Sequence, residues 1–334
     1  MGSKYFFNLE KIHPFSESTA GSLKWVTSKE VPGLVNISFS ILKLNPRGSQ
    51  EPIWHPNAHK IGYCTQGKAL VSIRTPTNFE VFSVQAGDVF FIPQGYIHHF
   101  ENIGPQEVVI NFACNVTIPQ VMCLSKAMQS LSDPVCEATF ATPPGFMDGL
   151  KKSRSEELLK TLTTKAPTLD FNASRFEFNI RGSHKPVTTK GGYLQLATKK
   201  CLPILEGLGI LGFGLNPKGV VEPHWHTNAG ELVYILKGEA RITILAPDGH
   251  VEILEVNGGQ GAFAPASYFH NIENIGDEKV EVIAFFNHAE PDYIGIGEVV
   301  GAYDPTLLGS IFNVEPNYFD ALRKTTDPLV IVPV

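Results

Sequence analysis

The sequence predicts an all-β protein built from two tandem β-sandwiches or barrels, one in each half of the chain. Three observations support this prediction: an internal repeat with a long period, short runs of alternating branched residues, and many turn residues between those runs. With 30 Gly and 24 Pro in 334 residues, the chain has enough turn formers for many short strands. Its length exceeds one average core and suits two domains.

The internal repeat is the most informative of these features. The chain reads LNPRGSQEP at 44–52 and LNPKGVVEP at 215–223, which is 171 residues later. WHPNA at 54–58 returns as WHTNA at 225–229, and ENIG at 101–104 returns at 273–276. Solenoid repeats span about 20–50 residues, so this period indicates a duplicated domain. A polar, weakly patterned stretch at 163–172 gives the boundary, which predicts an N-terminal domain over 1–165 and a C-terminal domain over 166–334.

Individual elements follow from local patterns. Strands are expected where branched and aromatic residues alternate: 69–73, 108–112, 240–245 and 280–286. Pro247, Asp248 and Gly249 predict a hairpin turn between two such runs. Short helices are expected after each barrel, where helix-forming residues gather: 119–128, 153–162 and 316–324. Their Leu and Met side chains are most simply explained as packing faces.

Composition and charge argue against two classes of partner. A net charge of −6 with no basic cluster provides no electrostatic footprint for nucleic acid. No run of about 18 apolar residues occurs, so a membrane span is not expected. The first residues lack an apolar stretch of signal-peptide length.

The number and spacing of the cysteines indicate the redox state of the cellular compartment. Five is an odd number, and no C-x-x-C pairing occurs among them. They are therefore expected to be mostly buried thiols in a reducing compartment, which predicts a cytoplasmic protein. A secreted form whose signal was removed is the alternative. The residues are Cys64, Cys114, Cys123, Cys136 and Cys201.

Four residues of the second copy form a candidate metal site: His224, His226, Glu231 and His270. Histidines two apart on a strand point to the same side, because side-chain direction repeats every two residues. Glu231 follows after a gap that fits a short turn and a return strand. Three imidazoles and a carboxylate suit Mn, Fe, Co, Ni or Zn, and contain too much nitrogen for Ca or Mg. The alternative is that each histidine is a hydrogen-bonded core residue.

The spacing around these residues resembles the two motifs of the cupin superfamily. The first motif is His-x-His, three or four residues, Glu, six residues and Gly, and here it ends at Gly238. The second runs from Gly259 through Pro265 to His270 and Asn274, with Ser267 where the pattern has Gly. The resemblance implies a double-stranded β-helix of the jelly-roll type for each copy. Trp225, Asn228 and Asn274 are interpreted as structural: an outward strand residue, a turn former and a loop hydrogen-bonding residue.

The two copies are chemically unequal. The first has Ile53 where the second has His224, and Lys60 where it has Glu231. His55 and His98 remain, but an ammonium beside two imidazoles disfavours a cation. The second motif of this copy is complete, with its glycines, proline, histidine and asparagine at Gly87, Pro93, Gly95, His98 and Asn102. We infer that the first barrel kept its fold and that its metal site is degenerate; His59 is assigned to the turn.

The whole chain resembles two-domain cupins of the oxalate decarboxylase, germin and spherulin type. The resemblance implies manganese held by His224, His226, Glu231 and His270, with iron, zinc, nickel and cobalt as alternatives. It further implies a small carboxylic acid as ligand, with cleavage of oxalate to formate and carbon dioxide. Helical arms that brace one barrel against the other or a neighbouring subunit are also implied. A homo-oligomer is compatible with the resemblance, and the sequence leaves the oligomeric state open.

Two positions depart from the decarboxylase pattern. That family has an Arg three residues before the first ligand His, whereas this chain has Val221, and Gln50 in the first copy. Its serine-rich lid with an acid/base Glu is not visible at 113–118, and Glu290 is the nearest substitute. The catalytic residues are therefore unassigned.

Three functional hypotheses remain. The first is a manganese-dependent oxidoreductase or decarboxylase acting on a small carboxylic acid or on superoxide through the single C-terminal site. The second is a non-catalytic storage, stress or small-ligand-binding protein with a structural metal. The third is a small-ligand sensor using a first-barrel pocket lined by Lys60, Tyr63, Phe90 and Phe91. Core packing is the favoured interpretation of those aromatics, because small barrels have filled interiors.

Overall fold

The protein, represented by a computed structural model, is described over residues 3–152, 157–164, 174–322, 325 and 328–334. It divides into two compact units. One, the first barrel, comprises Ile12–Val26 and Ser38–Asn179, and the other, the second barrel, comprises Met1–Lys11, Thr27–Ile37 and Ile180–Val334. The predicted boundary between residues 165 and 166 lies outside the described residues.

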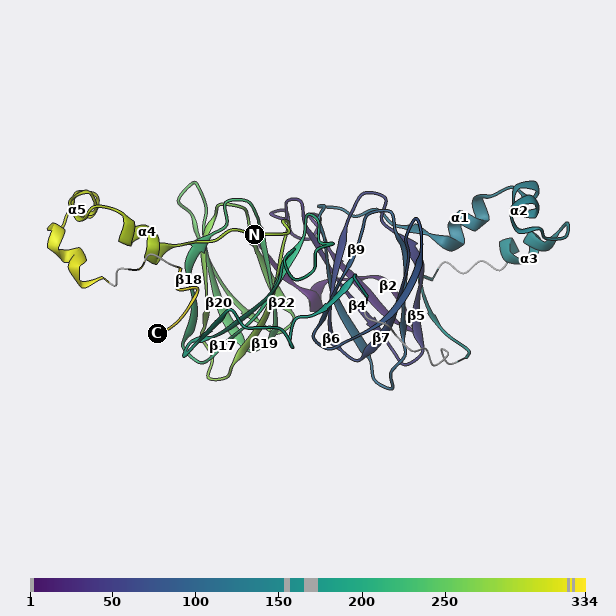
Figure 1. Ribbon diagram of the computed structural model, residues 1–334, viewed down its shortest axis with the longest axis horizontal. Coiled ribbons are helices and arrows are strands. Elements are labelled where there is room, and N and C mark those ends of the chain that lie inside the picture. The colour runs from purple at the N-terminus through teal and green to yellow at the C-terminus, as the bar shows by residue number, and fades with distance from the viewer. Residues whose placement is uncertain (1–2, 153–156, 165–173, 323–324, 326–327) are drawn as a thin grey trace. The chain divides into compact units, whose positions relative to one another are not determined.

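The first barrel consists of two antiparallel sheets, traced in dark colours in Figure 1. Neighbouring strands are mostly distant in sequence, as a jelly roll requires. In order across the larger sheet, the strands are β14 (Glu177–Asn179), β9 (Asp88–Ile92), β6 (Lys60–Gln66), β11 (Val108–Cys114), β4 (Ser38–Leu44), β3 (Gly21–Val26) and β2 (Pro14–Ser18). The facing sheet contains β12 (Met122–Cys123), β5 (Gly48–Trp54), β10 (Ile97–Asn102), β7 (Lys68–Arg74) and β8 (Phe79–Gln85), with β13 (Leu159–Thr161) also paired to β5.

The second barrel repeats this plan. Its larger sheet contains β1 (Phe6–Asn8), β22 (Gln260–Ala264), β19 (Glu231–Lys237), β24 (Val280–Phe286), β17 (Gly209–Leu215), β16 (Gly192–Ala197) and β15 (Val187–Thr189). Its facing sheet contains β21 (Val251–Asn257), β20 (Glu239–Leu245), β23 (Phe269–Asn274), β18 (Gly219–Trp225) and β25 (Ile294–Gly295), with β26 (Ile331–Pro333) also paired to β18. The two tandem jelly rolls predicted from the sequence are confirmed.

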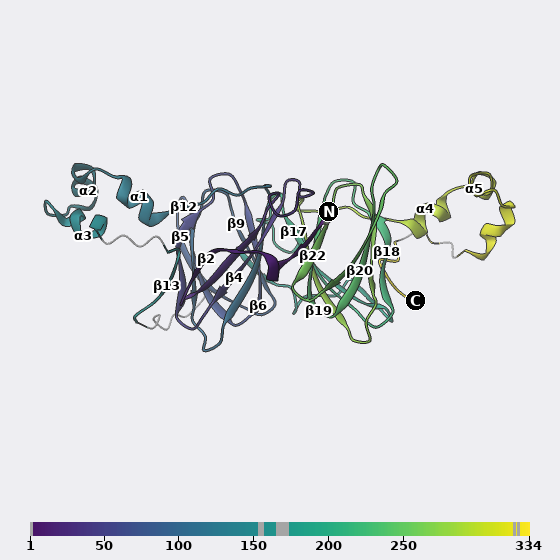
Figure 2. The ribbon, with the colours of Figure 1, turned by 180° about the vertical axis from the view of Figure 1, so that it is seen from behind.

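The first strand of the chain belongs to the second barrel. β1 pairs antiparallel with β22, with Phe6 opposite Ala262, so the segment Phe6–Asn8 runs beside β22 (Figure 2). The 3-10 helix η1 (Leu9–Lys11) follows it. Pairing at the sheet edge satisfies backbone groups that β22 would otherwise expose, so this segment closes a barrel whose other strands come much later in sequence.

The predicted hairpin is present in the second barrel. β20 and β21 pair along their whole length, from Glu239 opposite Asn257 to Leu245 opposite Val251. Gly249 takes a φ of 82°, a left-handed conformation that favours glycine, and its N–H donates to the Ala246 carbonyl at 2.9 Å.

The second barrel's core lies between its two sheets. Apolar side chains of both sheets alternate inward and form one cluster, to which Leu215, Ile242, Ile272 and Phe286 contribute with at most 1% exposure. Burying each such side chain contributes about 1.5–3 kcal/mol, so this interior accounts for much of the barrel's stability.

Short helices follow each barrel, as predicted. After the first come α1 (Leu124–Ser130), α2 (Asp133–Phe140) and α3 (Phe146–Lys152). After the second come α4 (Ile296–Ala302), α5 (Pro305–Phe312) and the 3-10 helix η2 (Pro316–Ala321). None of the helices in the described ranges is both long and apolar enough to cross a membrane.

One predicted helix is wrong in its described part. Of the segment 153–162, residues 153–156 lie outside the described residues, and Leu159–Thr161 is strand β13. Leu159 is opposite Gln50 in β5 and is fully buried. Edge pairing with burial of this leucine outweighs the helix propensity of its neighbours.

The cysteines behave as the sequence predicts. All five lie in the described ranges and none forms a disulfide. Four are buried, and Cys201 is partly buried.

Candidate metal centre

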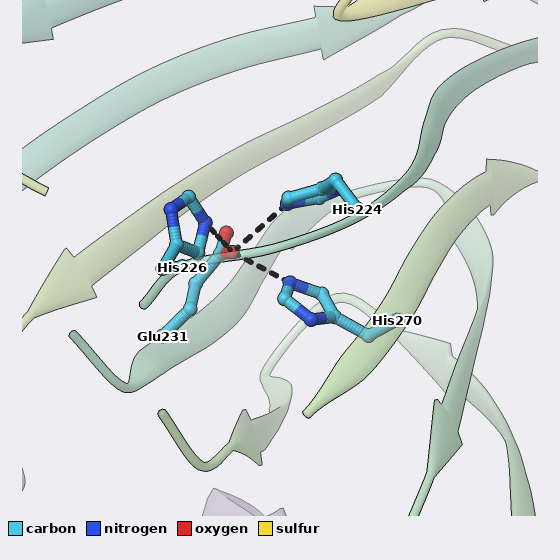
Figure 3. Close-up of side chains that lie close together, drawn as sticks. All are labelled: His224, His226, Glu231 and His270. Carbon is cyan, nitrogen blue, oxygen red and sulfur yellow. Dashed lines mark hydrogen bonds and ion pairs between the residues drawn. The ribbon is translucent and has the colours of Figure 1, made fainter. Parts of the chain in front are cut away.

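The four predicted ligands meet inside the second barrel (Figure 3). His224 lies in β18, and His226 directly follows that strand, so both rings point to the same side. Glu231 is the first residue of β19, across the barrel interior. His270 in β23 is opposite His224 in the strand register. Three strands from two sheets thus bring together residues up to 46 positions apart in sequence.

The three imidazoles converge on one carboxylate oxygen. The Nε2 atoms of His270, His226 and His224 lie 2.9, 3.1 and 3.6 Å from Oε2 of Glu231. The four ligand atoms are all within 4.8 Å of one another, and the residues are 2–4% exposed. Within the described ranges, this is the only group of three or more His, Cys, Asp or Glu with such an arrangement.

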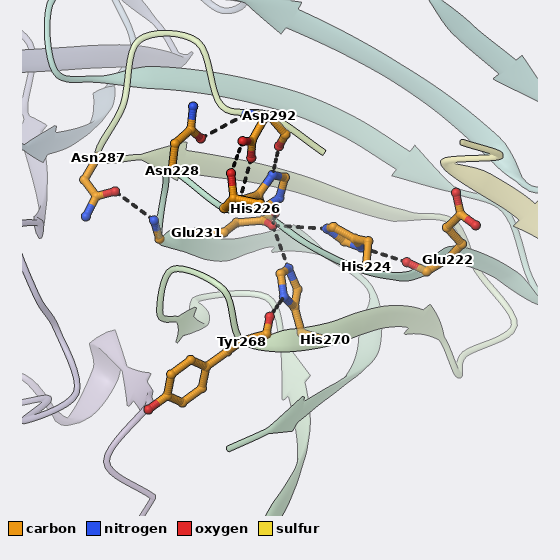
Figure 4. A network of polar contacts seen from close by, with 11 residues as sticks. Glu222, His224, His226, Asn228, Glu231, Tyr268, His270, Asn287 and Asp292 are labelled. Carbon is orange, nitrogen blue, oxygen red and sulfur yellow. Dashed lines mark hydrogen bonds and ion pairs between the residues drawn. The ribbon is translucent and has the colours of Figure 1, made fainter. Parts of the chain in front are cut away.

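Backbone carbonyls determine the tautomer of each ring (Figure 4). A carbonyl oxygen can only accept a hydrogen bond, so each Nδ1 must carry a proton. His224 Nδ1 donates to Glu222 O at 2.7 Å, His270 Nδ1 to Tyr268 O at 2.8 Å, and His226 Nδ1 to Asp292 O. A neutral ring then has its lone pair on Nε2, which is the atom that points at Glu231.

Burial and the mutual contacts shift the pKa values of these groups in different directions. Burial alone would raise the pKa of Glu231, but the close contacts of its carboxylate with the three imidazoles outweigh burial and hold this pKa well below its usual range. Burial lowers the pKa of His224 to about 4, with the neighbouring His270 adding to the effect. Burial also opposes protonation of His226, but contact with Glu231 raises its pKa. The site is therefore an ionised carboxylate facing imidazoles, and His226 attracts a proton more readily than His224 does.

This donor set fits a transition-metal ion. Three Nε2 lone pairs and an anionic oxygen repel one another unless a cation lies among them or a ring takes up a proton. Nitrogen and oxygen donors in this ratio suit first-row transition metals. The backbone bonds to Nδ1 hold the rings with their lone pairs inward.

A loop far along the chain supports the site, and the sequence did not indicate it. Asp292 accepts a hydrogen bond from Thr227 N at 2.6 Å and another from the Thr227 hydroxyl, and its own carbonyl holds His226. Asn228 accepts from Asp292 N at 3.0 Å, and Asn287 accepts from Gly230 N at 2.8 Å (Figure 4). No local pattern marks these residues, because their partners lie about 60 positions earlier.

Tyr293 is a second residue that the sequence did not indicate. Its ring stacks on His224, with centroids 4.4 Å apart and planes 17° apart. Burial, together with the carboxylates of Glu222 and Glu231, raises its pKa, so the phenol keeps its proton. A protonated phenol therefore lies against one candidate ligand.

The structural interpretations of Asn228 and Asn274 are confirmed. Asn228 ties the turn after β18 to the loop at Asp292, as described above. Asn274 donates to Leu215 O at 3.0 Å and to Glu278 O at 2.8 Å, and accepts from Gly276 N at 2.9 Å.

Ser267 is the one departure from the second motif, and its backbone is left-handed with a φ of 64°. Its counterpart in the first barrel, Gly95, is also left-handed, with a φ of 78°. The motif position is therefore one that favours glycine.

The corresponding position in the first barrel holds a different set. His55, Lys60 and His98 are at most 2% exposed, and Ile53 replaces the first histidine. Lys60 is opposite Cys114 and Ile92 in the register, so it enters the barrel as Glu231 does in the other copy. Lys60 lowers the pKa values of both histidines in addition to the effect of burial.

The predicted pocket of the first barrel is only partly assembled. Lys60 and Phe90 lie on one face of their sheet, because Gly62 is opposite Phe90 and two residues from Lys60. Tyr63 and Phe91 alternate to the other face. The prediction of a single pocket lined by all four side chains is therefore wrong, because alternation along the strands puts them on opposite faces of the sheet.

The departures from the decarboxylase pattern lie in ordinary structural positions. Val221 belongs to the apolar core of the second barrel, and Gln50 is fully buried in the first. Ala113 and Cys114 complete strand β11. Glu290 is exposed in the loop before Asp292.

Comparisons with known proteins agree with this architecture. A family model described as Cupin matches residues 7–144 and again 178–318. An oxalate decarboxylase of Bacillus subtilis (strain 168) is 23% identical over 326 residues, which cover 93% of this chain and 82% of that protein. A germin-like protein of Arabidopsis thaliana, subfamily 2 member 1, is 26% identical over 161 residues, covering 46% of this chain and 74% of that protein.

Solved structures show the same fold. The structure of oxalate decarboxylase from Bacillus subtilis at pH 4.6 matches with a TM-score of 0.88 and 19% identity, covering 100% of this chain and 88% of the other. Two matches to the family model, one in each barrel, span more than half of the chain. The chain therefore belongs to the cupin family, as a bicupin similar to oxalate decarboxylase.

Proposed function

We propose that the second barrel binds one transition-metal ion, manganese, through His224, His226, Glu231 and His270. On this proposal the protein is an oxidoreductase or decarboxylase acting on a small carboxylic acid. One observation carries it: three Nε2 atoms, each with Nδ1 bonded to a carbonyl, converge on one ionised carboxylate oxygen. A bound cation would turn this repulsive arrangement into an attractive one.

The choice of manganese rests on donor chemistry and on relatives. The mixed nitrogen and oxygen set accepts several first-row metals, and supply decides among them in the cell. Mn(II) centres occur in the Bacillus subtilis oxalate decarboxylase, which shares this fold with a TM-score of 0.88 at 20% identity. Iron, cobalt, nickel and zinc are the alternatives that metal analysis must separate.

The chain's own residues have distinct tasks in this proposal. Bound manganese would supply Lewis-acid and one-electron redox chemistry. Carbonyl bonds to Nδ1 hold the histidines, and Glu231 provides the negative charge that favours a cation. Tyr293 places a protonated phenol against His224, which makes it a candidate proton donor outside the ligand set.

The second candidate is a non-catalytic bicupin in which the ion is structural. It is favoured by Val221, an apolar side chain at the position where the decarboxylase pattern has an arginine to bind the substrate carboxylate. It is also favoured by the exposure of Glu290, the nearest substitute for an acid/base residue. For the same reason we expect oxalate cleavage, if the protein is an enzyme, to be slow.

Elemental analysis of the purified protein, followed by a substrate screen, separates these proposals. One manganese per chain together with turnover of oxalate or another small carboxylic acid supports the enzyme. One ion per chain without turnover, whose removal lowers the midpoint of thermal unfolding, supports the structural metal. Absence of bound metal after incubation with manganese and removal of excess would contradict both.

A further inference from the structure

A buried lysine in the first barrel lies in an aromatic environment. Lys60 is 1% exposed, and its Nζ lies 4.1 Å from the ring centroid of Phe112. The rings of Phe100 and Trp25 have centroids 5.5 and 5.9 Å from the same atom. Aromatic faces attract an ammonium only moderately, so they replace a small part of the hydration that burial removes.

Two imidazoles near this lysine have their basic atoms turned inward. The rings of His55 and His98 lie 5.7 Å apart. His55 Nδ1 donates to Gln120 O at 2.7 Å, and His98 Nδ1 donates to Tyr96 O at 3.0 Å, so both neutral rings have the lone pair on Nε2. Both Nε2 atoms are buried, and neither has a hydrogen-bond partner in the described part of the chain.

Further polar atoms of this barrel are also buried without a partner. They include the Trp25 indole N–H, whose ring lies 5.9 Å from that of His55, and both amide atoms of Gln50, which is opposite Phe100 in the register. Leaving such atoms unpaired costs about 1–3 kcal/mol each, and native interiors contain few of them. A small polar molecule bound among these atoms would supply the hydrogen bonds that they lack.

Burial makes Lys60 easier to deprotonate than an exposed lysine. Burial lowers the pKa of Lys60 to about 8, and the neighbouring Cys114 acts in the opposite direction. Burial raises the pKa of Cys114 to about 12, so that thiol is neutral, and burial with Lys60 lowers the pKa of His55 to about 3 and that of His98 well below its usual range. A desolvated amine beside neutral bases is the arrangement that favours attack on a carbonyl carbon.

We propose that Lys60 captures a small carbonyl compound, an aldehyde or a 2-oxo acid, as an imine inside the first barrel, with His55 and His98 transferring the protons. The proposed site needs no metal, and it does not depend on the function proposed for the second barrel.

The step balances without an oxidant or reductant. Nζ forms a bond to the carbonyl carbon, and the carbonyl π electrons move to oxygen, giving a carbinolamine. An imidazole Nε2 accepts a proton from Nζ and returns it to the oxygen. The carbon–oxygen bond then breaks, the C=N bond forms, and water leaves with the carbonyl oxygen and two protons from the amine. The Trp25 N–H and the Gln50 amide are donors available to the ligand's oxygens.

Reductive trapping in the full-length protein tests this proposal. The protein is incubated with glyoxylate and cyanoborohydride at pH 7, and modified lysines are identified by peptide mapping with mass spectrometry. Exposed lysines have a pKa near 10.4, so a group of pKa near 8 has roughly two hundred times more neutral amine at this pH. We expect adduct formation at Lys60 to be at least about tenfold faster than at the exposed Lys68.

Matched variants extend the test. Lys60→Met should abolish the fast adduct and Lys68→Met should leave it unchanged, while His55→Gln and His98→Gln should slow it. The wild-type map needs no substitution, so it decides the matter even where a variant fails to fold. Labelling of Lys60 no faster than that of Lys68 would overturn the proposal, and so would unchanged rates in both folded histidine variants.

Discussion

Lys60 and Glu231 occupy the same position in the two barrels. Each begins a strand, β6 or β19, and each is opposite the last residue of β11 or β24, Cys114 for Lys60 and Phe286 for Glu231. Both side chains are at most 3% exposed. One position in the duplicated fold thus carries a buried cation in one copy and a buried anion in the other, which reverses the kind of ligand that each interior attracts.

The first prediction separates the two barrels by metal content. His226→Ala should reduce bound manganese by roughly tenfold or more, because it removes one nitrogen ligand and the contact that this ring makes with Glu231. His55→Ala should leave bound manganese unchanged, since Lys60 disfavours a cation in that barrel. Elemental analysis after gel filtration measures both. Equal metal content in the two variants would sink the assignment.

The second prediction concerns the loop that supports His226. Asp292→Ala removes the hydrogen bonds to Thr227 and loosens the carbonyl that accepts from His226. We expect manganese affinity to fall about 10–100-fold, with the four ligands intact. Competition with a chelator measures the affinity. The exposed neighbour Glu290→Ala is the matched control, and an equal loss in both variants would count against a specific role for Asp292.

The third prediction is a pH-dependent gain in stability for Lys60→Met. The pKa of Lys60 falls from 10.5 to about 8 on folding, so the folded state loses a proton that the unfolded chain keeps between those values. The cost of burying the charge is therefore fully present below pH 8, at about 3 kcal/mol, and decreases as pH rises towards 10. Lys60→Met should raise the free energy of unfolding more at pH 7 than at pH 10.

Urea unfolding at both pH values measures this difference, with the exposed Lys68→Met as control. Surface substitutions usually change stability by less than about 0.5 kcal/mol, so the control should show little effect at either pH. If Lys60→Met raised the free energy of unfolding equally at both pH values, side-chain packing and not charge would govern the stability at this position.

The fourth prediction uses the one departure from the second motif. Ser267 has a φ of 64°, a left-handed conformation in which a side chain costs about 1–2 kcal/mol relative to glycine. Ser267→Gly should stabilise the second barrel by about 1 kcal/mol, since the Ser267 N–H to His226 O bond of 2.8 Å involves only backbone. Gly95→Ser is the reciprocal change and should destabilise the first barrel, because the φ of Gly95 is 78°. No atom lies within 4 Å of an added Cβ, so the backbone conformation and not a steric clash would cause the loss. Urea unfolding measures both changes, and effects of the same sign would contradict the strain argument.

The metal centre illustrates what local pattern can predict. His224 and His226 lie on one side because strand periodicity is local, and Gly238, Pro265 and Asn274 mark turns that the backbone itself requires. These rules act over a few residues, so both barrels and the four candidate ligands were predictable. The segment 153–162 shows the limit, because pairing of Leu159 with Gln50 is a long-range contact that overrides helix propensity.

The sequence by itself determined the duplicated all-β architecture, the cluster in the second copy and the chemical difference between Lys60 and Glu231. Only the tertiary structure decided which distant groups surround these residues. It placed β1 in the second barrel and the Asp292 carbonyl on His226, and it left the Nε2 atoms of His55 and His98 facing inward without a partner. The reason is physical: side-chain direction along a strand repeats locally, whereas burial, hydrogen-bond partners and pKa values depend on contacts between residues far apart in the chain.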